Sequence, residues 1–316
     1  MAELVTIGET MAALSAVRIG PLRHAGALEL SVAGAESTVA IGLARLGRTA
    51  AWIGRLGADE LGERVRMTLR GEGVEVHAAT DATAPTGLMI KERRTADRRR
   101  VHYYRAHSAG SRLRSEDIPD HLIEGAAVLH TSAITLALSD SAAATVRDAV
   151  RRARAAGVTV SFDANYRAKL WEQPDYRRAV SALLPALDVL FASSDEARAL
   201  LRTDTADPAA LATALLERGP RTVVITLGAR GALSAGPSGV VRAEAVRVSE
   251  TDPVGAGDSF VAGYLCATLD GRDEAGRLAH AGRVAAYSVS AHGDWEGLPT
   301  ATELADPQAA ATDVSR

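Results

Sequence analysis

Short apolar runs of β type recur along this chain and alternate with helical segments. The runs are VTIG, AWIG, AVLHT, TVSFD, VLFAS and TVVIT, at residues 5–8, 51–54, 127–131, 159–163, 189–193 and 222–226. This alternation is typical of a mostly parallel sheet covered by helices. The chain has 316 residues, so we expect one large α/β domain over residues 1–305 with a small appendage. The Ala-rich, polar stretch 306–316 has no periodicity, and it is predicted to be a disordered tail.

The segments between these runs carry helix signals. Val39 and Leu43 fall on one helical face, and Gly47 follows as a stop. Two further helices are predicted over residues 59–71 and from about 139 to 157, each ending at a glycine. These helices would cover the sheet.

Two segments, 12–33 and 86–107, break the alternation because they look like strands without an intervening helix. The second reads as a hairpin in which GLMIKE and RVHYYR flank a polar turn at residues 95–97. Side chains two positions apart in a strand share a face, so Tyr103 and Arg105 would point the same way. We expect the two segments to form a small separate sheet that acts as a lid.

The composition is that of a soluble globular protein with small-molecule partners. Apolar residues make up 47%, charged residues 24%, and the formal net charge is -3, which gives no overall attraction to nucleic acid or membrane. The single cysteine, Cys266, lies in an apolar helical stretch and excludes a disulfide framework. The N-terminus MAELVTIGE lacks a targeting pattern and no apolar stretch is long enough to span a bilayer, so a cytoplasmic location is expected.

The stretch TDPVGAGDSFVAGYL, residues 251–265, carries the strongest chemical signal. Amide groups of Gly255, Ala256, Gly257 and Asp258 at a helix start would form an anion hole for a phosphate group. A carboxylate at such a place is best explained as a base that accepts a proton from an alcohol, which makes Asp258 the candidate catalytic residue. The alternative is that Asp258 is an ordinary helix cap after a tight turn. Residues 5–12 match neither a phosphate-binding loop nor a dinucleotide fingerprint.

DPVGAGDSFVAGYL closely resembles the C-terminal signature of the PfkB sugar kinases. AGAESTVAIGLARLG and AAWIGRLGADELG are similar to the other signature of that family, with Thr38 where an Asn is usual. TLGARG at 226–231 resembles its nucleotide-binding turn, and SSDEA at 193–197 resembles its Asn-x-x-Glu motif with Ser193 in place of Asn. The resemblance extends to about residue 300. It implies a ribokinase-like three-layer fold and transfer of the γ-phosphoryl group of ATP, with Mg²⁺, to a sugar hydroxyl.

The resemblance also implies roles for single residues. Glu196 would help to organise Mg²⁺ and its waters, although a solvated helix residue is an equal reading. His280 occupies the position where many relatives have an Asn near adenine, and a partly buried helix histidine is the alternative. Many relatives bind a monovalent cation, and here Asp252 and the segment 290–293 could supply oxygens to K⁺. The nucleotide contacts implied by the family are Ser193, Thr226, Gly228, Ala229, Gly231, Gly255, Gly257 and His280.

Four stretches most resemble 2-keto-3-deoxygluconate kinases: GAE at 34–36, HYYRAHSAGS at 102–111, NYRAKLW at 165–171 and HGDWEG at 292–297. An acid sugar fits Arg105 and Arg167, which offer guanidinium groups to a carboxylate. Thr38, and Met89 where such kinases can have a Tyr, are departures that bear on specificity, so a neutral sugar such as fructose or ribose is the alternative. The expected substrate contacts are Gly34, Ala35, Glu36, Thr38, Tyr103, Tyr104, Arg105, Asn165, Arg167 and Asp258.

Two other functional classes are open at this point. A sugar- or nucleotide-binding regulator without activity is disfavoured because Asp258 and the whole anion hole are retained. Nucleic-acid binding through the arginines of residues 93–100 is disfavoured because Glu92 and Asp97 lie among them, as in a solvated turn. An uncovered sheet face on the lid predicts a homodimer or larger homo-oligomer.

Overall fold

The computed structural model describes residues 1–95, 98–249 and 251–305. Nine strands form one large sheet in the order β13-β12-β11-β10-β9-β8-β1-β4-β5. The strands are β1 (Leu4–Ile7), β4 (Ala50–Gly57), β5 (Glu75–Asp81), β8 (Val128–Ser132), β9 (Thr159–Asp163), β10 (Val189–Ser193), β11 (Thr222–Thr226), β12 (Ala232–Gly236) and β13 (Gly239–Ala243). Neighbours from β5 to β11 pair in parallel, and β12 and β13 continue the sheet antiparallel.

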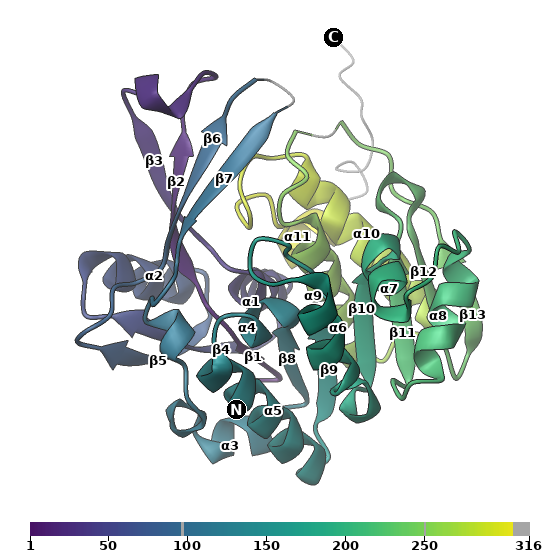
Figure 1. Cartoon of the computed structure of the whole chain (residues 1–316). Coiled ribbons are helices and arrows are strands. Elements are labelled where there is room, and N and C mark those ends of the chain that lie inside the picture. Colours follow the sequence, from purple (N-terminus) through teal and green to yellow (C-terminus); the bar gives the residue numbers. More distant parts are fainter. Residues whose placement is uncertain (96–97, 250, 306–316) are drawn as a thin grey trace.

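Helices cover both faces of this sheet (Figure 1). One core packs around α3 (Asp120–Glu124), α4 (Ala133–Leu136), α5 (Asp140–Ala155), α6 (Gln173–Ser181), α7 (Ser194–Leu201) and α8 (Pro208–Leu216). The other packs around α1 (Ala35–Arg45), α2 (Glu60–Gly71), α9 (Ala256–Leu269), α10 (Glu274–Val289) and α11 (Ala301–Ala305). Strand side chains alternate between the two cores: Val223 faces the first and Val224 the second. The predicted three-layer α/β sandwich is confirmed.

A second sheet of four strands, in the order β3-β2-β6-β7, projects from the body at one end (Figure 1). It consists of β2 (Met11–Ala16), β3 (Leu28–Ala33), β6 (Leu88–Arg93) and β7 (Arg99–Tyr104). β6 and β7 pair antiparallel, as the hairpin pattern predicts, and β2 pairs parallel to β6. We call this sheet the lid. Residues 96 and 97 of its predicted turn, and the predicted tail 306–316, lie outside the described residues.

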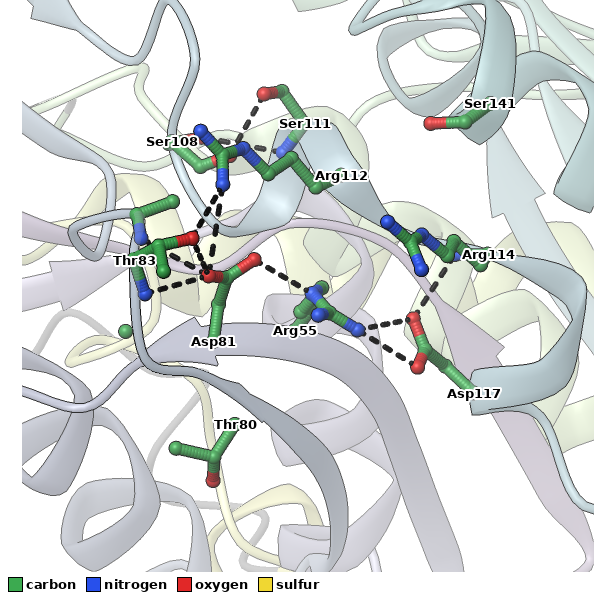
Figure 2. Close-up of polar contacts among 12 residues, drawn as sticks. Arg55, Thr80, Asp81, Thr83, Ser108, Ser111, Arg112, Arg114, Asp117 and Ser141 are labelled. Carbon is green, nitrogen blue, oxygen red and sulfur yellow. Dashed lines mark hydrogen bonds and ion pairs between the residues drawn. The ribbon is translucent and has the colours of Figure 1, made fainter.

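A buried ionic network holds the segments that lead into and out of the lid (Figure 2). Arg55 on β4 donates from Nε to Asp81 at 3.1 Å and from Nη1 to both oxygens of Asp117, at 2.9 and 3.1 Å. Asp81 also accepts the backbone N–H groups of Thr83 and Ala84 at 2.9 and 3.0 Å. Because these hydrogen bonds favour the charged form, the pKa of Asp81 lies well below its usual value. Both ends of the β6–β7 hairpin are therefore fixed to the edge of the main sheet.

Candidate active site

Two cavities meet at Asp258. One, of about 490 Å³, lies between the lid and the main sheet, and we call it the lid cavity. The other, of about 360 Å³, lies over the carboxyl ends of β9, β10 and β11, and we call it the sheet cavity. The two share Arg167, Val254, Gly255 and Asp258. Two ligands could therefore meet at this carboxylate from opposite sides.

The turn before α9 leaves its backbone amides open to a ligand. Gly255 has a φ of +77°, and a Cβ there would lie 2.1 Å from the backbone oxygen of Asp294. A side chain is excluded at this position by both the backbone conformation and the neighbouring segment. At Gly257 a Cβ would meet no atom within 4 Å, so the space beside it is free. Since a glycine begins the helix, no side chain caps the first-turn amides, which is the arrangement that binds anions.

Asp258 lies in the first turn of α9 with its carboxylate enclosed. Burial raises its pKa to about 7, the charge of Arg167 acts in the opposite direction, and Glu36, Asp294 and Glu196 raise it further. Asn165 Nδ2 donates to Asp258 Oδ1 over 3.5 Å. A carboxylate with a pKa near neutrality is suited to accept a proton from an alcohol.

Asp163, at the end of β9, was not among the residues singled out from the sequence. Both of its oxygens accept hydrogen bonds from Asn165, one from the backbone N–H and one from Nδ2, each at 3.1 Å. Burial and the negative charges of Glu196 and Asp258 hold its pKa well above the usual value. A usable signal existed in the sequence, because Asp163 is the last residue of a predicted parallel strand, the edge where ligands bind in such sheets.

Glu196 and Ser193 form a capping box at the start of α7. Glu196 Oε2 accepts the Ser193 N–H at 2.7 Å, Ser193 Oγ accepts the Glu196 N–H at 3.2 Å, and Oε1 accepts the Tyr166 N–H at 2.8 Å. Within the described residues no group of three or more His, Cys, Asp or Glu side chains could hold a metal by itself. Mg²⁺ at kinase sites binds through one or two carboxylates together with waters and nucleotide phosphates. Glu196 and Asp163 are the acidic side chains that line the sheet cavity away from Asp258.

The lid is closed over its cavity by contacts with three parts of the body. Lys91 Nζ on β6 pairs with Asp294 at 2.5 Å, and Arg99 on β7 pairs with Asp252. Lys169 Nζ, in the segment after β9, donates to the backbone oxygen of Val101 at 2.6 Å. These contacts hold the inner face of the hairpin against the loops around the anion hole.

Several predicted substrate residues line the lid cavity: Gly34, Ala35, Thr38, Tyr103, Arg105, Arg167 and Asp258. Thr38 is 1% exposed, and its Oγ1 has no hydrogen-bond partner among the described residues. A hydroxyl group of the substrate could form a hydrogen bond with this buried oxygen, as it would with the Asn expected at this position. Asn165 lines the sheet cavity instead. Met11, Ala33 and Met89 add an apolar wall to the lid cavity.

Two residues predicted as sugar contacts, Glu36 and Tyr104, do not line the lid cavity. Glu36 is fully buried and lines neither cavity, because its Oε1 accepts hydrogen bonds from Ser132 Oγ and Thr135 Oγ1, both at 2.7 Å. It fixes α1 to the end of β8. Tyr104 is 61% exposed and faces away from the cavity that Tyr103 lines, since neighbouring strand residues point to opposite faces.

The expected nucleotide residues are also divided by the structure. Ser193, Thr226, Gly255 and Gly257 line the sheet cavity. Gly228 and Ala229 lie in the exposed turn after β11. At Gly231 a Cβ would lie 2.0 Å from the backbone oxygen of Ala243, so a glycine at this position lets the two chain segments pack closely. His280 is 8% exposed on α10, lines neither cavity and has its Nδ1 3.3 Å from Arg272. The adenine contact of His280 stays a prediction.

The two arginines expected to bind a carboxylate differ in what they contact. Arg105 is 8% exposed and already paired with Glu9, to which its Nε and Nη2 lie 2.7 and 2.5 Å away. Arg167 is exposed to the cavities and acts on Asp258 and Asp163 only through its charge. Solvent hydrates its guanidinium, so folding does not require a counter-ion there. Arg100 and Lys169 also line the lid cavity without an ion-pair partner among the described residues, but of these three cations Arg167 is the one that also lines the sheet cavity and acts on Asp258.

Comparisons with known proteins agree with this geometry. Residues 1–301 match the model of the pfkB family of carbohydrate kinases. A 2-dehydro-3-deoxygluconokinase of Thermoproteus tenax is 39% identical over 311 residues, covering 96% of this chain and 93% of that protein. A 2-dehydro-3-deoxygalactonokinase of Haloferax volcanii is 37% identical over 294 residues, covering 93% and 92%. The crystal structure of a PfkB protein from Polaromonas sp. JS666 superposes with a TM-score of 0.88 at 36% identity, covering 96% and 99%.

With its nine-stranded sheet, its lid and a match over nearly its whole length, the chain belongs to the pfkB family of carbohydrate kinases and is an ATP-dependent sugar kinase.

Proposed function

We propose that this kinase phosphorylates the terminal hydroxyl of a 2-keto-3-deoxy sugar acid, with 2-dehydro-3-deoxygluconate as its preferred substrate. The observation that carries the proposal is the unpaired charge of Arg167 at the junction of the two cavities, beside Asp258. A substrate carboxylate would supply the anion that the protein does not. The names of the two relatives described above point to the same class of substrate.

In this proposal the sugar acid occupies the lid cavity and the triphosphate of ATP occupies the sheet cavity. The nucleoside would extend over the exposed turn at Gly228 and Ala229, next to Thr226. The γ-phosphoryl group would lie against the amides of Gly255 and Gly257, where the helix N-terminus favours negative charge. Mg²⁺ neutralises phosphate charge when bound, and Glu196 and Asp163 would hold its waters.

Asp258 would then act as the general base. It accepts the proton of the terminal hydroxyl as that oxygen attacks the γ-phosphorus, and the bond between the phosphorus and the β,γ-bridging oxygen breaks. The products are the phosphorylated sugar acid and ADP. The closed lid would exclude water, which would otherwise compete as the acceptor.

A neutral ketose is the second candidate, and the apolar wall of Met11, Ala33 and Met89 bears on the choice. This wall offers no hydrogen-bond donor to a hydroxyl group. A hydroxyl buried against it would lose its hydrogen bonds to water, whereas the methylene at C3 of a deoxy acid would not. The wall therefore favours the deoxy acid over fructose.

A coupled assay with 2-dehydro-3-deoxygluconate, its C4 epimer, fructose and ribose tests the proposal. We expect the highest kcat/KM for a deoxy acid. On the pH plateau, where Asp258 is ionised in both enzymes, we expect Arg167→Ala to lower that value by about 2 kcal/mol or more in transition-state free energy while changing the value for fructose little. Arg178→Ala, on the outer surface of α6, is the control. A higher kcat/KM for fructose or ribose, or an equal loss toward acid and neutral sugars, would exclude the acid assignment.

We also propose that the kinase is a cytoplasmic homodimer that binds neither nucleic acid nor membrane. Val17, Ile19, Leu30 and Tyr104 leave apolar surface exposed on or beside the lid strands, by 54, 55, 37 and 61%, and a second copy could cover it. No helix of the described residues is long and apolar enough to cross a membrane. A monomeric mass by light scattering at micromolar concentration would contradict the dimer.

A further inference from the structure

A positively charged side chain from the lid contacts the loop that leads into the anion hole, residues 251–254. Asp252 is 9% exposed, and its Oδ1 accepts the Val254 N–H at 3.2 Å. The N–H groups of Thr251 and Asp252 both donate to the backbone oxygen of Val289, at 2.7 and 3.1 Å. The loop is thereby attached to the end of α10, and its conformation sets where Gly255 begins α9.

The positive charge comes from Arg99 on lid strand β7. Its Nη1 forms an ion pair with Asp252 Oδ1, and its Nη2 donates to the backbone oxygen of Thr251 at 2.9 Å. The guanidinium therefore binds a carboxylate and a carbonyl of the same loop at once. Its side chain is 27% exposed and the Asp252 side chain 12%, so the pair is partly shielded from water.

The residues at this loop do not fit the K⁺ site that the family resemblance implies. Asp252, one of the residues expected to supply oxygens to K⁺, already accepts hydrogen bonds at Oδ1 from Arg99 and from the Val254 N–H. Asp252 Oδ2 faces His292, whose Nδ1 lies 4.0 Å away. A cation at this place would approach a permanently charged guanidinium, and like charges repel.

We propose that Arg99 supplies the positive charge that a monovalent cation would otherwise supply at the loop 251–254, and that this kinase therefore needs no K⁺. Arg99 belongs to the lid, so the charge reaches the loop only when the lid is closed. The neighbouring pair of Lys91 and Asp294 acts in the same direction, because the backbone oxygen of Asp294 lies directly against Gly255. Lid closure and the geometry of the anion hole are thus coupled through Arg99, which is a positioning residue.

The test compares wild-type enzyme and Arg99→Gln in K⁺ and in N-methylglucamine at equal ionic strength of about 0.1 M, so that screening is matched. We expect the wild-type kcat/KM to be the same in both salts. In N-methylglucamine, Arg99→Gln should lose about tenfold or more, as for one charge-assisted hydrogen bond, and K⁺ should restore part of the loss. The assay uses whichever sugar gives the highest kcat/KM, so it does not depend on the acid-sugar assignment.

Two control variants separate this role from a general loss of lid charge. Arg98→Gln removes the same charge from the exposed neighbouring position and should behave as wild type in both salts. Arg99→Lys keeps a cation at the loop and should stay independent of K⁺. A second readout does not need turnover: K⁺ should raise the melting temperature of Arg99→Gln but not that of the wild type. Activation of the wild type by K⁺, or an Arg99→Gln enzyme that responds to K⁺ in neither assay, would overturn the proposal.

Discussion

The pKa of Asp258 gives a quantitative expectation for the pH profile of the kinase. Burial raises this pKa to about 7, whereas an ordinary aspartate titrates at about 3.9. If Asp258 is the base, only its ionised form reacts. At pH 6 about one molecule in eleven would be ionised, so kcat/KM should be roughly tenfold below its plateau and should fall with unit slope at lower pH. With an ordinary pKa there would be almost no loss at pH 6.

The assay is kcat/KM for the sugar across the pH range, at a fixed MgATP concentration below its own KM. Two variants should move the acid limb in opposite directions. Arg167→Gln removes the positive charge that lowers the Asp258 pKa, so the acid limb should move to higher pH. Asp294→Asn removes a negative charge that raises the Asp258 pKa, so the acid limb should move to lower pH. An interaction of about 1 kcal/mol corresponds to roughly 0.7 pKa unit, which the assay resolves.

The position of the limb is informative even where a variant also lowers the plateau. Asp175→Asn, at a half-exposed position on α6, should leave the limb in place and serves as the matched control. A profile that stays flat down to about pH 5 in an active enzyme would refute the assignment of Asp258 as a base with a raised pKa. Shifts of the limb in the same direction in both variants would show that another group controls it.

Three further outcomes are expected. Asp258→Asn should lower kcat by at least about 10²-fold, while calorimetry shows ATP binding unchanged. Asp81→Asn should lower the free energy of unfolding, measured in urea at pH 7, by about 1 to 3 kcal/mol, because Arg55 loses a buried partner. Since the pKa of Asp81 is lowered in the folded protein, this difference in unfolding free energy should have its full size above about pH 5 and should shrink as pH falls. Lys91→Met leaves Asp294 buried and unpaired, so KM for the sugar should rise with ATP binding unchanged, whereas an unchanged KM would argue against lid closure through this pair.

The central part of the fold follows directly from the sequence. The runs predicted as strands coincide with β1, β4, β8, β9, β10 and β11 to within a few residues at each end, because strands buried on both faces are nearly continuous apolar runs. The edge strands β5 and β13 were not predicted. Their residues are mostly half-buried or exposed, so neither an apolar run nor a strict alternation marks them. Edge strands depend on pairing with a neighbour, which a local pattern does not contain.

The parts of the site that are local in sequence were also the parts that could be predicted. Gly255 to Asp258 lie within one turn, so their spacing already defines a helix N-terminus with a carboxylate in it. The approach of Asp163 to Glu196 depends instead on the parallel pairing of β9 with β10, in which Asp163 lies opposite Phe191. The direction of individual side chains could not be predicted either. Tyr103 points into the lid cavity, Tyr104 points to solvent and Glu36 points into the core.

The charges around the lid cavity show why a count of arginines and lysines does not identify a binding site for an acid. Arg99, Lys91 and Arg105 look equally available in the sequence, yet each has a carboxylate partner, in Asp252, Asp294 and Glu9 respectively. A cation that is already paired gains little from a second anion, since that anion must compete with the first. Arg167 differs because only its charge reaches the neighbouring carboxylates. Arg100 and Lys169 also lack an ion-pair partner among the described residues, but they do not line the sheet cavity. The acid-sugar proposal therefore depends on Arg167, which lies beside Asp258, and the paired cations are better explained as the contacts that close the lid.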